Sequence, residues 1–596
     1  MKTILLLTII GIIEALHCDK EYNQIESFYE RGYDITCQGL TNNFTHLLQE
    51  LEVTNEISLK MENCNLTEVS PNLFHNVEHI KHFYLENSTF SYKKSESVFK
   101  LLENLEDLKI ISTKFEVTKN SLSNLKRLKE LTLVKNELSF IEKGAFNDLK
   151  SLKELHITEN HLKDLNNVPL CELKMLTTLN FSKNEIQDLG HNLYCQNIQR
   201  NSLIINNKPP PLNSSTIISF PSSLDLYEID LSHNNIKDLS TSFAFLKSLR
   251  IVKLQGNKLN RLNNSHFTFL EYLENLRVDN NALTFIEGNV FKDKQFLELL
   301  DLSNNELFFL NMKDLKSVKY LNLANNRLQI DSILSININN TLEILILDNN
   351  NVTEMKPNTF KKYLNLKTLR LSGNKMELSS FCLNGLFSLR KLYIINNSIK
   401  KIPKEVFKDL HNLTLLDLSQ NNLTILDHNE TFSSLRQLEV LNLSRNSLTS
   451  LSYALVEPLK NLVVLDISYN KLRDIDYDVI LTNLPLLSIL DIKFNMLSCE
   501  LLSKIIKYLQ TRGVTYTVQD KIDLDKVNVG GIYCNNEKVT NKAVSEPISQ
   551  KSVMFNVTLG LIVVLILVIL CIVIFKVHVY LKRRKYRADE FELIDE

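Results

Sequence analysis

The chain has 596 residues, with 68 basic and 69 acidic side chains and a formal net charge of −1. This length accommodates several ordinary domains or one elongated array. The balanced charge provides no basic field for nucleic acid, so no nucleic-acid partner is expected. Gly is scarce and Trp is absent, which excludes collagen-like and low-complexity chains.

The first 17 residues have the features of a signal peptide. Lys2 precedes an apolar run from Ile4 to Ile13, which is too short to span a bilayer. Cleavage is expected between Ala15 and Cys18, and a retained signal anchor is the alternative.

One template, L-x-x-L-x-L-x-x-N-x-L, recurs along most of the chain, for example in LELLDLSNNEL (297–307) and LEVLNLSRNSL (438–448). Successive copies are about 24 residues apart, and their Asn residues form a series: Asn136, Asn160, Asn184, Asn234, Asn257, Asn281, Asn305, Asn326, Asn350, Asn374, Asn397, Asn421, Asn446, Asn470 and Asn495. In three earlier copies the same position, which we call the ladder position, holds Cys64, Ser88 and Thr113.

The interval between Asn184 and Asn234 is about twice the usual step. We interpret RNSLIINNKPPPL (200–212) as a degenerate repeat inside it, which brings the array to roughly nineteen turns. The KPPPL stretch (208–212) is either an Ω-like loop or part of a damaged repeat.

Each residue type of the template has a physical role. Its leucines alternate with polar residues, which predicts one short parallel strand per turn with the leucines inward. The Asn side chain is expected to satisfy backbone groups of the turn after the strand, away from water. A Phe recurs ten residues after the ladder position and is expected to fill the convex side: Phe74, Phe146, Phe267, Phe291, Phe360 and Phe407.

This array resembles the leucine-rich repeat horseshoe of Toll-like receptor ectodomains and insect leucine-rich immune proteins. The resemblance implies an α/β solenoid with parallel strands on its concave face. It divides the chain into a signal peptide (1–17), an N-terminal cap (18–50), the array (51–498), a C-terminal cap (499–534), a juxtamembrane linker (535–554), a transmembrane helix (555–575) and a cytoplasmic tail (576–596). The TIR domain of Toll-like receptors is missing from this tail, so signalling is expected to run through partner chains.

Six cysteines are expected to form three disulfides. Cys499 and Cys534 enclose a helix-like segment that resembles the C-terminal cap of this superfamily, with two cysteines in place of the familiar four, and the resemblance implies that they pair. Cys18 and Cys37 are expected to form an N-terminal clasp if cleavage leaves Cys18 in the mature chain. Cys171 and Cys195 each lie eleven residues after a ladder Asn. They therefore stand on neighbouring turns, about 5 Å apart and within reach of a bridge.

Two further cysteines are expected to stay reduced. Cys64 occupies a ladder position and is predicted to be a buried thiol that replaces Asn. Cys382 has no evident partner: it either links two chains or is buried, and we favour burial.

Thirteen N-x-S/T sequons predict a glycosylated ectodomain: Asn43, Asn65, Asn87, Asn180, Asn213, Asn263, Asn339, Asn351, Asn396, Asn412, Asn422, Asn429 and Asn442. Asn180 and Asn442 fall between the strand leucines and are expected to point from the concave face. Glycans there would obstruct the face near both sites and leave the middle turns open.

The outward position between the two central strand leucines is mostly polar, and two apolar exceptions define a candidate contact site. Ile346 and Tyr393 occupy this position with Arg370 between them, and Ile344 and Ile395 stand at neighbouring outward positions. Apolar residues around an Arg are typical of interface anchors, although scattered apolar residues occur on any surface. Tyr469 and Phe494 are candidates for a dimer contact, and packing against the C-terminal cap explains them equally well.

The chain contains no G-x-S-x-G, H-E-x-x-H, phosphate-loop or CxxC motif. We therefore expect no enzymatic activity, no cofactor and no metal site.

A membrane span is expected near the C-terminus. The run from Val557 to Phe575 carries no charge and would be about 28 Å long as a helix. Basic residues follow it directly, which predicts a single-pass type I protein of the plasma membrane with contact to lipid. In the tail, Asp589, Leu593 and Ile594 resemble an acidic dileucine sorting signal, which implies a clathrin adaptor and endosomal cycling; a merely solvated tail is the alternative.

The leading functional hypothesis is a cell-surface receptor or co-receptor of innate immunity. It would bind a protein or microbial ligand on the concave or lateral face, as a monomer, homodimer or heterodimer. The alternative is an adhesion or developmental recognition protein of the same fold.

Overall fold

The computed structural model describes residues 17–24, 31–41, 56–75, 77–189, 224–239, 242–243, 246–311, 314–330, 341–426, 430–519 and 526–535. The chain divides into two units, Met1–Asn535 and Asn536–Glu596, and every described residue belongs to the first. No described helix has both the length and the apolar character of a membrane span. Most of the predicted signal peptide, the predicted span (555–575) and the sorting motif lie outside the described residues.

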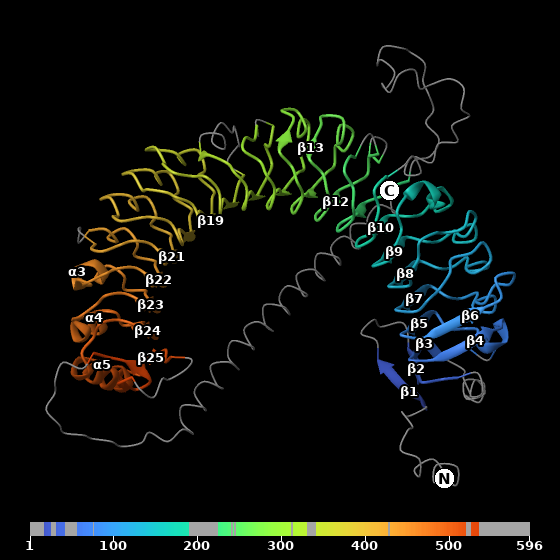
Figure 1. The fold of residues 1–596 in the computed structure, drawn as a ribbon, viewed down its shortest axis with the longest axis horizontal. Helices are drawn as coiled ribbons and strands as arrows, with labels where there is room; N and C mark the ends of the chain where they lie inside the picture. The colour runs from blue at the N-terminus through green and yellow to red at the C-terminus, as the bar shows by residue number, and fades with distance from the viewer. Residues whose placement is uncertain are drawn as a thin grey trace, which may run out of the picture. The chain divides into compact units, whose positions relative to one another are not determined.

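The described unit is built on one sheet of 21 strands. Its strands follow the inner edge of a curved array and the connecting segments lie outside (Figure 1). In chain order they are β1 (His17–Gln24), β2 (Arg31–Gln38), β3 (Glu56–Glu62), β5 (His82–Glu86), β7 (Asp107–Ile111), β8 (Glu130–Val134), β9 (Glu154–Thr158), β10 (Thr178–Asn180), β11 (Glu228–Asp230), β12 (Ile251–Lys253), β14 (Asn275–Arg277), β16 (Leu299–Asp301), β17 (Tyr320–Asn322), β18 (Ile344–Ile346), β19 (Thr368–Arg370), β20 (Lys391–Tyr393), β21 (Leu415–Asp417), β22 (Val440–Asn442), β23 (Val464–Asp466), β24 (Ile489–Asp491) and β25 (Thr515–Tyr516).

Within the described part of this sheet every pairing from β2 to β25 is parallel, as the template predicted, whereas β1 pairs antiparallel to β2. Smaller pieces occupy the edges and the convex side: β4 (Asn65–Val69), β6 (Thr89–Tyr92), β13 (Arg261–Leu262), β15 (Phe285–Ile286), β26 (Asn528–Val529), β27 (Ile532–Tyr533), η2 (Pro71–Phe74), η3 (Leu165–Asn167), η4 (Leu170–Glu172), α3 (Tyr453–Val456), α4 (Tyr477–Asn483) and α5 (Cys499–Arg512).

The ladder residues connect each turn to the one before it. Nδ2 of Asn326 donates to the carbonyl of Leu302 in the preceding turn at 3.0 Å, and to Leu323 and Ala324 in its own turn at 3.1 and 3.2 Å. Its Oδ1 accepts from the backbone N–H of Leu307, again in the preceding turn. These backbone groups are buried away from water, and the Asn326 amide supplies the hydrogen bonds that water would otherwise make, as predicted.

The first turns use smaller side chains for the same purpose. Oγ of Ser88 accepts from the N–H of Cys64, and Oγ1 of Thr113 accepts from the N–H of Ser88. The thiol of Cys64 is 3.3 Å from the carbonyl oxygen of Glu62. Each of these groups makes fewer bonds than an Asn, so the ladder starts with weaker links.

The predicted degenerate repeat at 200–212 is wrong. Strand β10 pairs directly with β11, with Leu179 opposite Ile229. The ladder also passes straight across, because Nδ2 of Asn234 donates to the carbonyl of Phe181 at 2.9 Å. In the described sheet β10 and β11 are direct neighbours, so the array has one turn fewer than predicted, and residues 190–223 are inserted in the sequence between two neighbouring repeats. The segment itself lies outside the described residues.

Aromatic rings fill the convex side as predicted. All six expected Phe residues are at most 2% exposed. Rings of successive turns contact each other, as in Phe407 and Phe432 with centroids 6.1 Å apart. The hydrophobic core is therefore continuous along the array, and each turn depends on its neighbours for burial.

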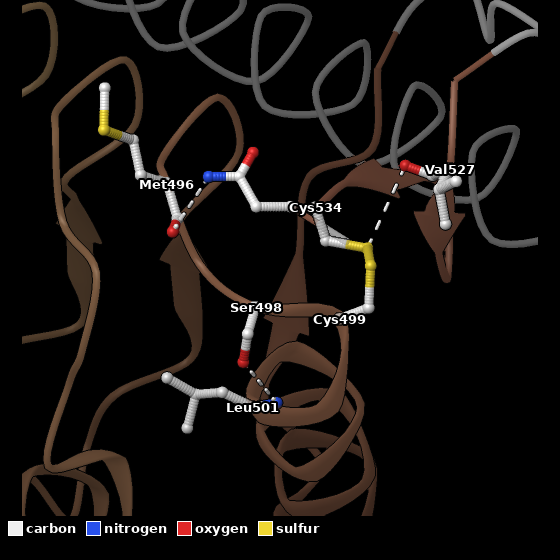
Figure 2. The surroundings of a disulfide bond; sticks show 7 residues. Met496, Ser498, Cys499, Leu501, Val527 and Cys534 are labelled. Carbon is white, nitrogen blue, oxygen red and sulfur yellow. Dashed lines mark hydrogen bonds between the residues drawn. A yellow bond between two sulfur atoms is a disulfide. The ribbon is translucent and has the colours of Figure 1, made fainter. Parts of the chain in front are cut away.

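A helical cap covers the last turn. Helix α5 begins at Cys499, is N-capped by the Ser498 hydroxyl and ends at Arg512. Gly513 follows as the C-cap, and its φ of 68° suits a glycine. It buries four apolar residues against the final turns: Leu502, Ile505, Ile506 and Leu509. The disulfide between Cys499 and Cys534, the pair expected from the sequence, joins the start of the helix to the returning chain (Figure 2).

Candidate ligand-binding face

The candidate contact residues stand side by side on the sheet. Ile346, Arg370 and Tyr393 occupy equivalent positions of β18, β19 and β20 and are paired in register. In each of these strands the middle residue is buried and its neighbours are exposed or half-buried. Since alternate residues of a strand share a face, the three side chains lie together on the outward face.

Arg370 is held in place from both sides. Its Nε donates to Oδ2 of Asp348 at 2.6 Å, and its guanidinium carbon lies 4.9 Å from the ring centroid of Tyr393. Oδ1 of Asp348 accepts in turn from the backbone N–H of Ser372. The Arg370 side chain is still 39% exposed. The result is a pre-ordered guanidinium at the surface, which loses little side-chain entropy when it binds a partner.

Ile344 and Ile395 border this row. Ile344 lies two residues before Ile346 on the same face of β18, and Ile395 lies in the turn after β20, where its N–H donates to Oγ of Ser372 at 3.2 Å. Both side chains are half-buried. The structure thus brings the five candidate residues together, and we call Ile344, Ile346, Arg370, Tyr393 and Ile395 the Arg370 cluster.

Sequence reasoning missed two residues that extend the cluster. Leu299 on β16 and Tyr320 on β17 are half-buried, face outward and pair in register with Ile344. Burial, followed by the charge of Asp301, raises the pKa of Tyr320 above its usual range. The sequence carried a sign of them. Leu299 and Tyr320 occupy a strand position that holds an acidic residue in earlier turns, for example Glu130 and Glu154.

A second aromatic group lies at the edge before the strands. Arg250 stands over the rings of Tyr227 and Tyr272, with centroid distances of 5.6 and 5.8 Å. The Tyr272 ring stacks on Phe296, with centroids 5.7 Å apart. These aromatics are 41 to 50% exposed, and Arg250 also pairs with Glu274 at 2.5 Å. The lateral surface therefore offers apolar contact area as well, although the guanidinium of Arg250 is paired with Glu274.

Tyr469 and Phe494, the dimer contact candidates, stack on each other. Their ring centroids are 4.2 Å apart, Arg445 covers Tyr469, and Phe494 meets Tyr533 of the cap at 6.0 Å. Both residues have positive φ, of 53° and 55°, a conformation that bulky side chains rarely adopt. The column joins both aromatics to the cap, the packing that the sequence left open as one interpretation, and the dimer contact stays a prediction.

The remaining cysteines divide into bonded and free groups. Cys37 is disulfide-bonded and stands opposite Cys18 in the β1–β2 register. Cys171 is also disulfide-bonded, and its expected partner Cys195 lies outside the described residues. Cys64 and Cys382 are free and buried, which excludes a link between chains through Cys382. Burial raises the pKa of the Cys382 thiol to about 11.

The described sequons all lie at the surface. Each is exposed or half-buried, unlike the buried ladder Asn residues: Asn65, Asn87, Asn180, Asn263, Asn351, Asn396, Asn412, Asn422 and Asn442. Four more are outside the described residues: Asn43, Asn213, Asn339 and Asn429. Asn180 and Asn442 end β10 and β22, and Nδ2 of Asn442 donates to Asp417 at 3.0 Å.

Family models confirm the repeat. The leucine rich repeat model matches residues 126–186, 224–282, 271–328, 340–394, 387–448 and 436–497, together more than half of the chain. The chain belongs to the leucine-rich repeat family. A model of the BspA type leucine rich repeat region matches residues 49–146, so the repeat also includes the early turns that lack the ladder Asn.

Relatives of this leucine-rich repeat protein match only in part. A Danio rerio protein, transforming growth factor beta activator LRRC33, is 32% identical over 105 residues, which are 17% of this chain and 15% of that protein. The human leucine-rich repeats and immunoglobulin-like domains protein 1 is 37% identical over 91 residues, 15% of this chain and 8% of that protein. The chain thus spans a small share of these relatives, and the matches indicate shared repeats.

Solved structures share the fold. The Leptospira interrogans leucine-rich repeat protein LIC12759 is 26% identical with a TM-score of 0.53, covering 70% of this chain and 91% of its own. A chain of the Drosophila Toll–Spatzle complex is 17% identical with a TM-score of 0.58, covering 84% of this chain and 72% of its own. The leucine-rich repeat array therefore resembles a receptor ectodomain in fold.

Proposed function

We propose that this leucine-rich repeat protein is a cell-surface recognition receptor of innate immunity that binds a protein or microbial ligand on its concave face. The Arg370 cluster is the observation that carries the proposal. It combines aromatic and aliphatic side chains with an Arg that is already ordered by Asp348 and Tyr393. Such groups supply most of the binding energy in protein interfaces.

Surface position supports this choice. The cluster lies on β18 to β20, between the sequons of Asn180 on β10 and Asn442 on β22. We propose that glycans at these two sites cover the neighbouring turns. The strands β11 to β21 between them contain no sequon, although Asn396 follows Ile395 in the turn after β20, and we propose that their outward face stays accessible. A large ligand would then be directed to the turns around Arg370.

The expected topology completes the proposal. Cleavage of the signal peptide, a single span at 555–575 and a basic tail would place the array outside the cell. We also propose the bridges Cys18–Cys37 and Cys171–Cys195, which would clamp the first turns and the edge of the insertion. The dileucine-like motif with Asp589, Leu593 and Ile594 would bind a clathrin adaptor and return the receptor to endosomes.

A binding assay on intact cells tests the function against its alternative. The full chain is expressed at the cell surface and exposed to labelled microbial cell-wall preparations, and separately to beads coated with the same chain. The immune receptor captures a microbial or host protein ligand and does not bind its own copies. If the cells bind the coated beads and do not bind the microbial preparations, the protein is an adhesion molecule instead.

A matched pair of variants localises the binding. Arg370→Ala removes the guanidinium from the cluster, and Arg277→Ala removes an exposed Arg at the equivalent position of β14. The proposal predicts that Arg370→Ala weakens capture by about tenfold or more, as expected for an interface anchor. Arg277→Ala should bind as the wild type does.

A further inference from the structure

Strands β16 to β20 carry an apolar band that crosses them obliquely. Leu299, Tyr320 and Ile344 form one row in register on β16, β17 and β18. A second row, Ile346, Arg370 and Tyr393, continues in register on β18, β19 and β20. Because Ile344 and Ile346 share the outward face of β18, this strand joins the rows, and the band steps by two residues along the strand direction.

Opposite charges occupy the two corners beside this oblique band. Asp301 follows Leu299 by two residues on β16, and Lys391 precedes Tyr393 by two residues on β20, each on the outward face. Oδ1 of Asp301 accepts from the N–H of Ser303, and its Oδ2 accepts from Nδ2 of Asn322 at 3.1 Å. Oγ of Ser303 also donates to Oδ1 of Asp301 at 2.7 Å. Asp301 is half-buried and Lys391 is exposed, so both charges lie at the surface of the band.

We propose that this oblique band is the docking site of an amphipathic helix carried by the protein ligand. The inference rests on the proposed receptor function and specifies the form of its ligand. The helix would place apolar side chains on Leu299, Tyr320, Ile344 and Tyr393. Near one end, the helix would carry a cation on the flank that faces Asp301. Near its other end, it would carry an anion on the opposite flank, which faces Lys391.

The sheet favours a helix over an extended peptide. Strands β16 to β20 are each hydrogen-bonded to a neighbour on both sides, so they present no free edge to which a strand could be added. An extended ligand would have to leave backbone N–H and C=O groups unpaired over an apolar surface. A helix satisfies these groups internally and offers an apolar stripe about two rows wide.

The dimensions and charges fit one orientation. Neighbouring strands are about 4.8 Å apart and the band steps by about 7 Å along the strands, so its length is about 20 Å, or about 13 residues of helix. Turning the helix end for end would exchange the two corners. Its cation would then face Lys391 and its anion Asp301, so only one direction is electrostatically favourable.

A stapled helical peptide is the probe. It has 15 residues, a leucine stripe at i, i+3, i+4 and i+7 spacing, one Lys and one Glu on opposite flanks near opposite ends, and a photoreactive diazirine at its N-terminus. The full-length chain is purified in detergent and irradiated with the peptide, and crosslinked residues are mapped by mass spectrometry. A peptide that binds only to the detergent gives no crosslink to residues of the sheet, so it is not mistaken for a docked peptide. We expect crosslinks confined to one end of the band.

Protein variants distinguish peptide binding at the band from non-specific binding of the peptide. Tyr320→Ser should lower the crosslink yield by about tenfold, the loss typical of a central aromatic contact. Leu415→Ser is the matched control, because Leu415 is a half-buried residue at the same repeat position of β21 but lies outside the band. It should leave the yield unchanged. Thermal unfolding of both variants verifies that the array is folded.

Charge exchange tests the predicted direction. Asp301→Lys and Lys391→Glu should each lower the yield by about fivefold, the effect of losing one interfacial charge pair and gaining a repulsion. The double variant should recover the yield and move the crosslink to the other end of the band. Equal yields for wild type and Tyr320→Ser, or a double variant that neither recovers nor reverses, would overturn the helix proposal.

The two proposals fail in different ways. If cells capture a ligand and Arg370→Ala abolishes capture while the peptide never crosslinks to β16 to β20, the helix proposal is wrong and the receptor function stands. If neither ligand nor peptide depends on this face, the receptor function proposed here is wrong as well.

Discussion

The side-chain amide of Asn326 donates to the carbonyl of Leu302 at 3.0 Å, across the boundary between two turns. The same amide closes its own turn through Leu323 and Ala324, and its oxygen accepts from Leu307. One buried side chain therefore satisfies backbone groups in two repeats. Stability in this array is a property of neighbouring pairs of turns, because neither turn keeps its hydrogen bonds without the other.

Removing this amide should destabilise the array locally. Asn326→Ala leaves several buried backbone groups without partners, so we expect a loss of about 3 kcal/mol in the free energy of unfolding. Arg327→Ala, next in sequence, breaks only an exposed ion pair with Glu306 and should cost less than about 1 kcal/mol. Hydrogen exchange of the amides around β16 and β17 measures both. Equal protection in the two variants would contradict the role of the ladder.

A buried histidine should make stability depend on pH. His266 is 1% exposed, its Nδ1 accepts from the backbone N–H of Asn263, and its Nε2 lies 3.4 Å from Asp238. Burial lowers the pKa of His266, with Asp238 acting in the opposite direction. The unfolded chain therefore binds more protons. The stability from the neutral ring is present above the unfolded pKa, about 6.5, and is lost as pH falls through the lower folded pKa.

Replacing His266 by Val should remove this contribution. Val290 and Val406 occupy the equivalent position in other turns and are buried there, so the substitution fits the core. We expect the melting temperature of His266→Val to fall less between pH 7.5 and pH 5.5 than that of the wild type. His411→Val, at an exposed histidine, is the control. Identical slopes for wild type and His266→Val would disprove this account.

A buried lysine offers a route to higher stability. Lys294 is 3% exposed and takes the place that Leu246 and Leu270 hold in the two preceding turns. Its Nζ donates to the carbonyls of Lys292 and Thr268 at 3.1 and 3.4 Å, and burial lowers its pKa. Lys294→Leu should raise the free energy of unfolding by about 1 to 2 kcal/mol. The exposed Lys292→Leu should change it little, and calorimetry compares the two.

The cap disulfide should protect the end of the array. Cys499 and Cys534 are 35 residues apart in sequence, with Cα atoms separated by 5.0 Å. Replacing both with Ser should cost about 3 kcal/mol in cap stability through the entropy of the opened loop. Limited proteolysis should then cut between α5 and β27 first. Replacing the buried free thiols Cys64 and Cys382 with Ala should leave that cleavage pattern unchanged.

The repeat made most of the fold predictable from the sequence. Parallel strands, buried ladder residues and convex Phe side chains follow from a template whose leucines and Asn are visible in each copy. The insertion was misread because RNSLIINNKPPPL has leucine-like spacing, whereas the pairing of β10 with β11 depends on contacts between residues some 50 positions apart.

The candidate site was only partly predictable. The sequence indicated the Arg370 cluster because Ile346 and Tyr393 break the polar pattern of one outward position, with Arg370 between them and two isoleucines at neighbouring outward positions. It could not show that Asp348, in the turn after β18, orients Arg370, since that contact joins different repeats. Leu299 and Tyr320 were missed because they occupy the other outward position of their strands, and only the register of β16, β17 and β18 brings that position into line with Ile344.

A glycan placed on the Arg370 cluster tests the central claim most directly. Arg370→Asn creates a sequon in one step, because Leu371 and Ser372 follow it, and Asn already occupies this position in Asn322 on β17. Asp230→Asn creates the same N-L-S sequence on β11, away from the cluster. With glycan attachment at both sites verified by mobility, ligand capture at the cell surface should fall more than about tenfold for Arg370→Asn and stay unchanged for Asp230→Asn. Full capture by the glycosylated Arg370→Asn variant would contradict recognition through this face.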